Sequence, residues 1–517
     1  MAEQYDDEEV YEEEAEDGGG NQPLHELLSH APWWMISVFI HAIALIVIML
    51  LSDEPPPPPQ VTEFTATLEN EAEIPPEEKE EAWEEEKELD PEKEPTEHPV
   101  QKDNAVESDH NETDNDDEHR ENKGEDMDAM SDTPFKGKST NTAIGLGGGA
   151  SGAFGGRFGG KENLVASGGG RGTQSAVDMG LRWLAAHQDK SRGMWDSDDF
   201  QAQCKKNTCS GRGAEWCDPG QTGLALLAFL GAGHTHQQGK YQETVKLALQ
   251  YLKDIQDQEG CFGPRNNNYM YNHAIACLSM AEAYGMTKSP LLKEAAQKGI
   301  DFIVSAQNPG FGWRYKTKPG DNDTSVSGWV IMALKSAKVA ELSVPSDGFV
   351  GAKNWLDSVT DDQYYRTGYI QRGDTGARLR DQIGKFSPAE SCSAISIMSR
   401  VFMGSERGEP LLKGQGDLLS QSLPTWDTNG GPGGTSKIDF YYWYYGTLAM
   451  FQLGGDYWKT WNESMKTAIV SHQRKDGDER GSWDPIDAWG SEGGRVYATS
   501  VNVLSLEIYY RYERVFK

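Results

Sequence analysis

The chain has 517 residues and a formal net charge of −34. This charge sits at one end, because residues 1–132 hold 42 acidic against 6 basic residues, whereas the other 385 residues hold 40 acidic against 42 basic ones. Such an acidic leader would repel polyphosphate and the remainder carries no basic stripe, so we expect no nucleic acid as a partner.

The first predicted element is a membrane anchor at residues 32–52, behind an acidic tail at 1–31 that we expect to be disordered. Residues 35–51 are apolar apart from Ser37 and His41 and are numerous enough to cross a bilayer as one helix. The tail is too long and too acidic for a signal peptide, so the sequence predicts a single uncleaved span. Both flanks are acidic, and charge alone does not predict its orientation.

Residues 32–41, which read PWWMISVFIH, and the run DEPPPPP at 53–59 resemble the N-terminal anchor of TonB-type energy transducers. Ser37 and His41 match the Ser-x3-His of that family and share one helix face. The resemblance implies a docking face for a complex of the ExbB/ExbD kind, while the alternative is a histidine tolerated near the membrane interface. It also implies a bacterial inner-membrane protein with a cytoplasmic tail and a periplasmic remainder. Nothing matches the receptor-binding domain of TonB.

Two linkers follow the predicted span. Residues 53–136 combine prolines with acidic blocks that cannot bury enough apolar surface to fold, and we expect them to be disordered. Residues 137–174 are rich in glycine, which is typical of a flexible hinge. The folded domain is predicted to occupy 175–517.

From residue 175 onward one motif recurs at intervals of roughly 50 to 70 residues. It has an aromatic residue and a Leu or Ile near a helix end, then a Gln, a Gly and a second aromatic residue. Copies lie at 180–195, 248–262, 298–313 and 468–483, with a degenerate copy that opens at Trp355 and a weak one at 411–426. The Gln can bond free backbone groups at the helix end while the indole packs across the turn, so we predict a structural clasp.

Six other helices, more apolar and poorer in charge, are predicted between the copies. They begin near Gln221, Tyr271, Thr324, Ser391, Phe440 and Ala498. Amphipathic helices that alternate with nearly all-apolar ones indicate an outer ring around a buried inner ring. The sequence therefore predicts an all-α fold in which six helical hairpins close on themselves.

These repeats resemble the QW repeat of the squalene/terpenoid cyclase and protein prenyltransferase superfamily over residues 175–517. The resemblance implies an (α/α)6 toroid, in which the first turns of the inner helices line a cavity at one end. Aromatic side chains on these helices would suit an apolar, cationic or sugar ligand. The candidates to line this cavity are Tyr271, His273, Trp329, Glu390, Asp439, Tyr441, Tyr444 and Tyr497.

The acid of such cyclases is the middle Asp of Asp-x-Asp-Asp-Thr. The nearest match is Asp321-Asn322-Asp323-Thr324, which places Asn322 where the proton donor belongs, and an amide cannot protonate an alkene. Asp321 or Asp323 could supply the proton if its carboxyl is kept neutral, or Asp323 could simply cap the following helix. The Asp-x-Cys of zinc-dependent prenyltransferases is absent, so we predict no metal and no cofactor.

Lyases and glycosidases with other α/α toroids offer a further alternative. They use a tyrosine with a histidine, or paired carboxylates. Tyr271 with His273, or Asp439 with Glu390, could be recruited in that way.

Four cysteines lie near one another along the chain. Cys204, Cys209 and Cys217 fall in one loop and Cys261 is within reach, so all four are candidates for disulfides in an oxidising compartment. Free thiols and a metal site with the nearby His234 and His236 are the alternatives, although no CxxC occurs.

Three functions remain open. The first is a binding or interaction module for an apolar ligand, a glycan or a protein, because the scaffold is intact and the expected acid is missing. The second is an enzyme of the toroid class with rearranged acids, since Asp321 and Asp323 lie at the expected helix head. The third is a TonB-like component coupled to an ExbB/ExbD-type motor through the anchor.

Overall fold

A computed structural model describes residues 41, 164, 167–206, 208–375 and 378–512. Of the predicted anchor it describes only His41, which is helical and exposed. Ser37 and the rest of 32–52 lie outside the described residues, as do the tail 1–31, the linker 53–136 and most of 137–174. Within the part of the chain that is described, none of the helices has the length and apolar character that a membrane span needs.

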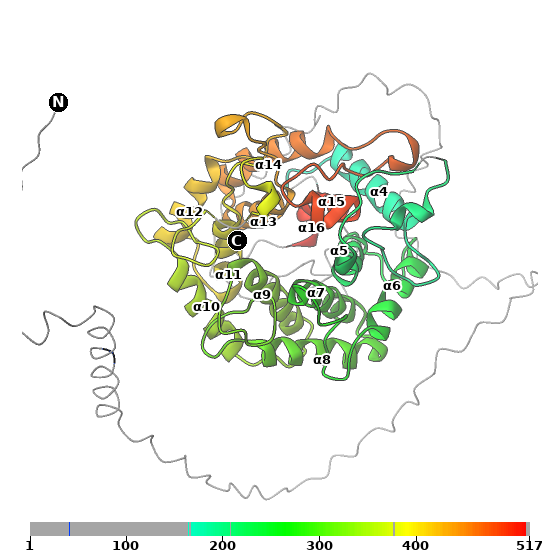
Figure 1. The fold of residues 1–517 in the computed structure, drawn as a ribbon, viewed down its shortest axis with the longest axis horizontal. Coiled ribbons are helices and arrows are strands. Elements are labelled where there is room, and N and C mark those ends of the chain that lie inside the picture. Colours follow the sequence, from blue (N-terminus) through cyan, green and yellow to red (C-terminus); the bar gives the residue numbers. More distant parts are fainter. Residues whose placement is uncertain (1–40, 42–163, 165–166, 207, 376–377, 513–517) are drawn as a thin grey trace, which may run out of the picture. The chain divides into compact units, whose positions relative to one another are not determined.

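The described residues contain thirteen α-helices and no strand, and twelve of these helices alternate between two concentric rings (Figure 1). The outer helices are α4 (Arg171–Ala186), α6 (Gln242–Asp254), α8 (Pro290–Ala306), α10 (Asp347–Val359), α12 (Pro410–Ser420) and α14 (Gly455–Val470). The inner helices are α5 (Asp218–Gly231), α7 (Tyr269–Thr287), α9 (Thr324–Val339), α11 (Ser391–Met403), α13 (Phe440–Leu453) and α15 (Gly490–Leu506). Each inner helix packs on the next, and α15 packs on α5, so the ring closes and the predicted α/α toroid is confirmed.

Short elements complete the domain. The connections carry the 3-10 helices η2 (Phe200–Gln203), η3 (Glu215–Cys217), η4 (Arg380–Gln382), η5 (Pro432–Gly434) and η6 (Gly477–Glu479). The last helix, α16 (Ile508–Arg511), follows α15 and is wholly buried. Its Arg511 pairs with Glu282 of α7 at 3.2 Å, and both side chains are fully buried, so α16 is fixed against the inner ring.

Burial separates the two rings as the composition predicts. The inner helix α5 is buried from Pro219 to Gly231, whereas the outer helix α6 buries only one face. Five inner helices begin within three residues of the predicted positions, but α15 begins at Gly490 instead of Ala498. The helix breaks at Gly494, where φ is +67° and a side chain would collide with the backbone of Gly213. This glycine-dependent turn has no hydrophobic period, so the sequence pattern did not indicate it.

The predicted clasps are present, but the glutamine and the indole have different roles from those predicted. The glutamine links neighbouring hairpins, and the indole bonds the helix end. Each glutamine amide donates one hydrogen bond within its own turn and one to a carbonyl of the next outer helix, which ties neighbouring hairpins together. The pairs of acceptors are Gly193 and Thr244 for Gln188, Gly260 and Ala295 for Gln256, Phe311 and Gly348 for Gln307, and Gly481 and Ala176 for Gln473. The last pair joins α14 to α4 and closes the outer ring.

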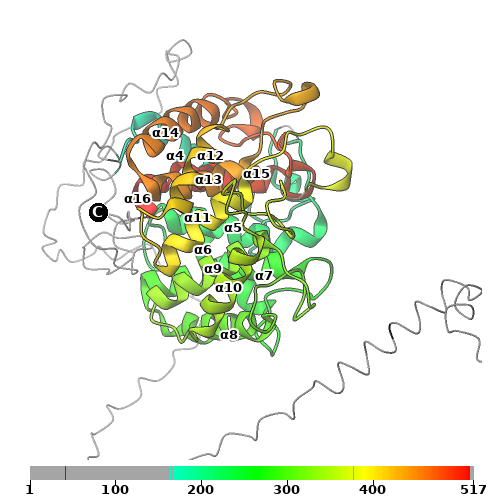
Figure 2. The same cartoon turned by 90° about the vertical axis from the view of Figure 1, so that its left-hand side faces the viewer.

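The indoles, and not the glutamines, satisfy the helix ends. Trp195, Trp313 and Trp483 each donate the indole N–H to a carbonyl in the last turns of the preceding outer helix, at 2.7 to 2.8 Å. Carbonyls in the last turn of a helix lack the amide donors of a following turn, and a fully buried tryptophan supplies one donor here. The carbonyls of Leu184 and Ile469 also accept the amide N–H groups of His187 and His472. The side view in Figure 2 shows the paired helices that these turns connect.

Candidate functional site

Side chains from the first turns of the inner helices meet at one end of the ring. Ser325 of α9 and Tyr441 of α13 share a hydrogen bond between their hydroxyls across the ring, and the Tyr441 ring lies 5.9 Å from that of Trp489, just before α15. We call the group that surrounds these contacts the mouth. It comprises Tyr271, Arg314, Tyr315, Asp321, Asp323, Ser325, Tyr369, Arg378, Asp439, Tyr441, Asp487, Trp489 and Tyr497.

Asp323 is the buried acid of the mouth. Its Oδ1 accepts the amide N–H of Val326 at 2.7 Å, so it caps α9 as the sequence suggested. Oδ2 makes no hydrogen bond to any described residue and lies 3.8 Å from Nε of Arg314. Burial raises the pKa of Asp323 to about 7, against the opposing effects of the Val326 amide and the Arg314 charge.

Asp321 and Asn322 lie in different surroundings from Asp323. Asp321 is exposed, and its carboxylate pairs with the guanidinium of Arg314. The side chain of Asn322 accepts a hydrogen bond from Nδ2 of Asn308 at 2.9 Å, which holds the loop before α9. Of the two candidate acids, only Asp323 is therefore desolvated.

Tyrosine hydroxyls surround the Asp323 carboxyl. Tyr315 and Tyr369 share a hydrogen bond between their hydroxyls, and the Tyr315 ring lies 5.9 Å from that of Tyr271. Burial, followed by the nearby charges of Tyr369 and Asp323, raises the pKa of Tyr271 well above its usual value, so this phenol stays protonated at neutral pH.

The sequence reasoning missed Arg314, Tyr315 and Tyr369, because it searched the inner helices and these three residues lie in the connections. Tyr369 is placed by its own carbonyl, which accepts the amide N–H of Thr324, while the Thr324 hydroxyl donates to the carbonyl of Gly368. Apart from the glycines and polar residues typical of loops, no pattern distinguishes this segment.

A second pair of buried carboxylates lies at the heads of α13 and α15. Asp439 caps α13 through the amide of Tyr442 and pairs with Arg378 at 2.9 Å. Asp487 accepts the amide N–H of Phe440 at 3.2 Å and the hydroxyl of Tyr497 at 3.3 Å. Burial and then the charge of Asp439 raise the pKa of Asp487 to about 8. Asp487 and Arg378 also escaped the sequence reasoning.

Glu390 is engaged in an ion pair of its own. Arg366 donates to both of its carboxylate oxygens, with the closest approach 2.7 Å, in a two-pronged arrangement that suits a guanidinium. No hydrogen bond or ion pair joins Glu390 to Asp439 among the described contacts.

His273 is a packing residue of the inner ring. Its Nδ1 accepts the amide N–H of Phe262 at 3.0 Å, its Nε2 lies 3.2 Å from the carbonyl of Gly299, and its ring stacks on Phe262. Burial lowers the pKa of His273 to about 3, so the ring is neutral. In the other three intact copies of the motif a hydroxyl takes the place of this imidazole. It accepts the backbone amide N–H of the tryptophan that corresponds to Phe262, and these hydroxyls belong to Thr222, Ser327 and Thr499.

Aromatic side chains fill the interior beyond the mouth. Trp329, Tyr444 and Tyr445 are at most 2% exposed. The Trp329 ring stacks on Tyr444 at 5.6 Å and meets the edge of Tyr445 at 5.4 Å. The rings therefore pack against one another across the centre of the toroid, while Tyr271, Tyr441 and Trp489 in the mouth stay partly exposed.

All six cysteines carry free thiols in the structure, and the sulfurs of Cys204 and Cys209 lie 3.1 Å apart. Two groups in the described part of the chain are close enough to share a metal ion: His187 with these two cysteines, and Asp196, Asp198 and Asp218. The acidic group is partly exposed and its internal hydrogen bonds account for it, since Asp218 accepts the amide of Ser197 at 2.8 Å.

Residues 171–368 match the family model of the squalene-hopene cyclase C-terminal domain, which supports the resemblance to the cyclase superfamily drawn from the repeats. The match covers α4 to α10 and does not include residues 32–52, so the TonB-like anchor stays a prediction. No curated protein matches the chain.

Several solved structures are similar at low identity. One is a novel alpha-amylase from Clostridium perfringens, with 12% identity, a TM-score of 0.45, and 66% of this chain and 99% of that chain covered. Another is the type II terpene cyclase MstE from Scytonema, with 13% identity, a TM-score of 0.43, and 65% and 97% covered. A third is an inactive alpha-1,6-mannanase of Salegentibacter sp. in complex with alpha-1,6-mannotriose, with 14% identity, a TM-score of 0.44, and 65% and 99% covered.

Proposed function

We propose that the toroid is a binding module and that its mouth takes a polar, hydroxyl-bearing ligand of the glycan class. One observation carries the proposal: the interior that an apolar substrate would need is occupied by Trp329, Tyr444 and Tyr445, whereas the mouth keeps aromatic rings partly exposed. An apolar chain would have to displace these rings, which are packed against one another. A ligand at the mouth displaces only water.

The chemistry of the mouth fits a sugar. Partly exposed rings of Tyr271, Tyr441 and Trp489 offer apolar faces, while Arg314 and Arg378 offer fixed donors. Each guanidinium also lies over an aromatic ring, Arg314 over Tyr315 at 5.0 Å and Arg378 over Trp489 at 5.9 Å. A few fixed polar groups among aromatic walls are the usual composition of a ligand site.

The test is a binding screen of the full-length chain against panels of glycans and polyprenoids, followed by titration of any hit. Trp489→Ala should weaken glycan binding roughly tenfold or more, because stacking on an exposed ring is lost. Trp426→Ala is the matched control: Trp426 is also partly buried but lies in the connection after α12 and stacks on His472. Equal losses in both variants, or binding of polyprenoids alone, would overturn the proposal.

An enzyme is the second candidate, and Asp323 is the observation that favours it. A buried carboxyl with a pKa of about 7 is suited to general acid catalysis near neutral pH. In that case Asp323→Asn should abolish turnover of a terpenoid or glycoside panel while ligand binding persists, and Asp321→Asn should change it little, since Asp321 is exposed. The rate should fall as pH rises through about 7, because the acid must be protonated.

We also infer that the domain is tethered to a bacterial inner membrane on its periplasmic side. The support is the apolar run at 35–51 and its TonB-like pattern of Ser37 and His41. Photocrosslinking from positions beside His41 in native membranes should capture an ExbB-like protein if the anchor docks on a proton-driven motor. If the segment spans the membrane but no crosslink forms, the tether hypothesis stands and docking on a proton-driven motor is contradicted.

A further inference from the structure

A cluster of one histidine and two cysteines lies in the connection between α4 and α5, and none of the three residues belongs to the mouth. His187 ends α4, Cys204 ends η2, and Cys209 lies in the extended segment that follows. Nε2 of His187 is 3.7 Å from the Cys204 sulfur and 3.5 Å from the Cys209 sulfur, and the two sulfurs are 3.1 Å apart. Three donor atoms of types that bind soft metals therefore face one another.

We propose that His187, Cys204 and Cys209 bind a thiophilic divalent cation, with Zn²⁺ as the first case. Around a tetrahedral zinc, bond lengths of about 2.3 Å to sulfur and 2.0 to 2.1 Å to nitrogen place nitrogen and sulfur about 3.6 Å apart and two sulfurs about 3.8 Å apart. Both nitrogen–sulfur distances already match these values. The sulfurs have only to separate by roughly 0.7 Å to admit the ion, on the same bond lengths.

The imidazole is held in the tautomer that a ligand needs. Nδ1 of His187 donates a hydrogen bond to the carbonyl of Trp183 at 2.9 Å. The proton therefore stays on Nδ1, and the lone pair of Nε2 is directed at the two sulfurs. The ring stacks on Trp183 at 4.2 Å and meets the edge of Phe200. A backbone carbonyl behind a histidine is the usual support of a metal-binding imidazole.

One sulfur has a supporting hydrogen bond, and the cluster has room for a fourth ligand. The amide N–H of Cys209 donates to the Cys204 sulfur at 3.3 Å and so fixes the position of that sulfur. A cavity of about 290 Å³ adjoins the cluster, lined among others by His187, Cys204 and Asp478. Asp478 is the carboxylate of that lining and accepts the amide N–H of Lys206. A fourth ligand to the ion, either water or this carboxylate after a shift, would enter from the cavity.

The geometry favours a metal over a disulfide between the same cysteines. At 3.1 Å the sulfurs are not bonded, and a disulfide would leave the lone pair of a buried, locked imidazole without a partner. The sequence analysis predicts no metal, and its alternative metal site pairs the loop cysteines with His234 and His236. His187 was not considered, because its distance along the chain from Cys204 gave no ligand spacing.

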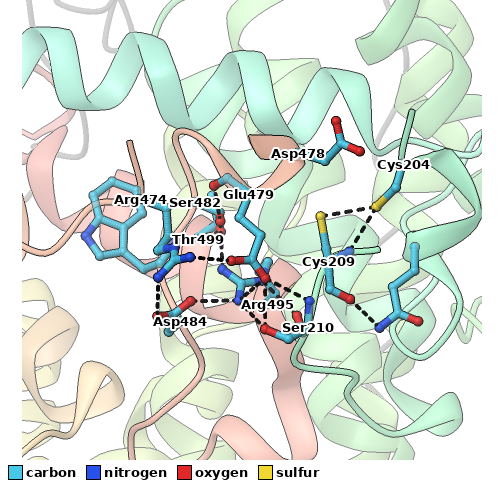
Figure 3. A network of polar contacts seen from close by, with 12 residues as sticks. Cys204, Cys209, Ser210, Arg474, Asp478, Glu479, Ser482, Asp484, Arg495 and Thr499 are labelled. Atoms are coloured by element: carbon cyan, nitrogen blue, oxygen red, sulfur yellow. Dashed lines mark hydrogen bonds and ion pairs between the residues drawn. The ribbon is translucent and has the colours of Figure 1, made fainter. Parts of the chain in front are cut away.

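The position suggests what the metal would do. The segment that carries the cysteines also holds the last hairpin, since Ser210 donates its amide to Glu479 at 2.8 Å and Arg495 donates to the Ser210 carbonyl at 2.8 Å (Figure 3). Figure 3 shows Cys204 and Cys209 beside Asp478 and Glu479, which belong to the turn between α14 and α15. Metal binding would therefore fasten the first hairpin to the last, at the seam where the ring closes.

The test uses the full-length chain, reduced, freed of metal with a chelator and titrated with Zn²⁺ alone. We expect one tightly bound equivalent and a thermal midpoint that rises with Zn²⁺ concentration. Cys204→Ser, Cys209→Ser and His187→Gln should each weaken binding at least about tenfold. Cys217→Ser is the matched control, a buried cysteine of the same connection that lies outside the cluster, and it should bind as the unchanged chain does.

A second readout does not depend on variants that fold. With Co²⁺ in place of Zn²⁺, thiolate ligation gives a sulfur-to-metal charge-transfer absorption, and Zn²⁺ should protect Cys204 and Cys209 from alkylation in the unchanged chain. A variant that carries all three substitutions, His187→Gln, Cys204→Ser and Cys209→Ser, is the reference. The proposal is overturned if the unchanged chain binds Zn²⁺ and Co²⁺ as weakly as this variant does. It is equally overturned if the isolated, unreduced protein shows these two cysteines joined as a disulfide.

Discussion

The six outer-helix turns fall into two kinds. After α4, α6, α8 and α14 a glutamine amide links the turn to the next outer helix. After α10 the direction is reversed, because Gln415 of α12 reaches back and donates to the hydroxyl of Thr367 at 2.8 Å. After α12 no amide takes part: Trp426 stacks on His472 at 4.1 Å, and the hydroxyl of Tyr457 donates to Asp417 at 2.6 Å.

The difference indicates which part of the repeat the fold requires. Every turn is joined to a neighbouring hairpin, but the joining group varies in residue type, in direction and in burial. The intact turns all contain a fully buried aromatic ring, while their glutamines range from buried (Gln188, Gln473) to partly exposed (Gln256, Gln307). Trp426 and Tyr457, which form the link after α12, are both partly exposed. Every hairpin is therefore linked to its neighbour, whichever residue makes the link. The link after α12 should stabilise the fold less than the intact turns do, because contacts that water reaches contribute less to the free energy of unfolding.

Removing an indole should give the largest contrast between the two kinds of turn. Trp313→Ala deletes a fully buried ring and leaves the Ile303 carbonyl without its donor, so we expect a loss of about 3 to 5 kcal/mol in the free energy of unfolding. Trp426→Ala, in the substitute turn, should cost less than half as much. Urea denaturation followed by circular dichroism measures both, and equal losses would contradict the comparison.

The pH dependence of stability should also differ between the two kinds of turn. Asp487 follows the intact turn after α14, and its pKa is raised to about 8, so the stability it provides is complete below about pH 4 and is lost as pH rises through about 8. Asp487→Asn should remove a fall of roughly 2 to 4 kcal/mol across that window. Unfolding free energies measured at steps of pH test this slope.

Asp357, at the end of α10, is a control because its pKa is shifted in the opposite direction to that of Asp487. Burial opposes the shift, but hydrogen bonds from Lys353 and Arg400 prevail and lower the pKa of its carboxyl. Its contribution is therefore present above the usual Asp value and is lost as pH falls through the lowered one. Asp357→Asn should change stability at neutral pH and leave the fall between pH 4 and 8 intact; a variant that removes that fall would refute the assignment to Asp487.

The glutamine links should give the smallest of the three effects. Gln473→Leu removes two hydrogen bonds, to Ala176 and Gly481, and we expect a loss of about 1 to 3 kcal/mol. Gln415→Leu removes one, to Thr367, and should cost about half as much. Hydrogen exchange near α4 should increase in the first variant alone, since Gln473 closes the outer ring; exchange that is unchanged there would show that closure rests on other contacts.

The sequence by itself determined the number and order of the hairpins and the division into inner and outer helices. It could do so because buried and half-buried helices differ in apolar pattern, and because the motif of glutamine and aromatic residue recurs, intact or degenerate, at hairpin intervals. It also indicated Asp323 as a residue that could cap α9, since capping depends only on neighbours along the chain. These are local properties, and a linear pattern records them.

Tertiary structure alone decided which side chains meet. Arg314 and Tyr369 join Asp323 in the mouth from separate connections, and His187 meets Cys204 and Cys209, because the path of irregular segments depends on the surface over which they pack. The filling of the interior by Trp329 and its neighbours also depends on the distances between helices across the ring. No period along the chain encodes the distance between side chains on irregular segments, whether these are far apart in the sequence, as Ser325 and Tyr441 of the mouth are, or within one connection, as His187 and Cys209 are.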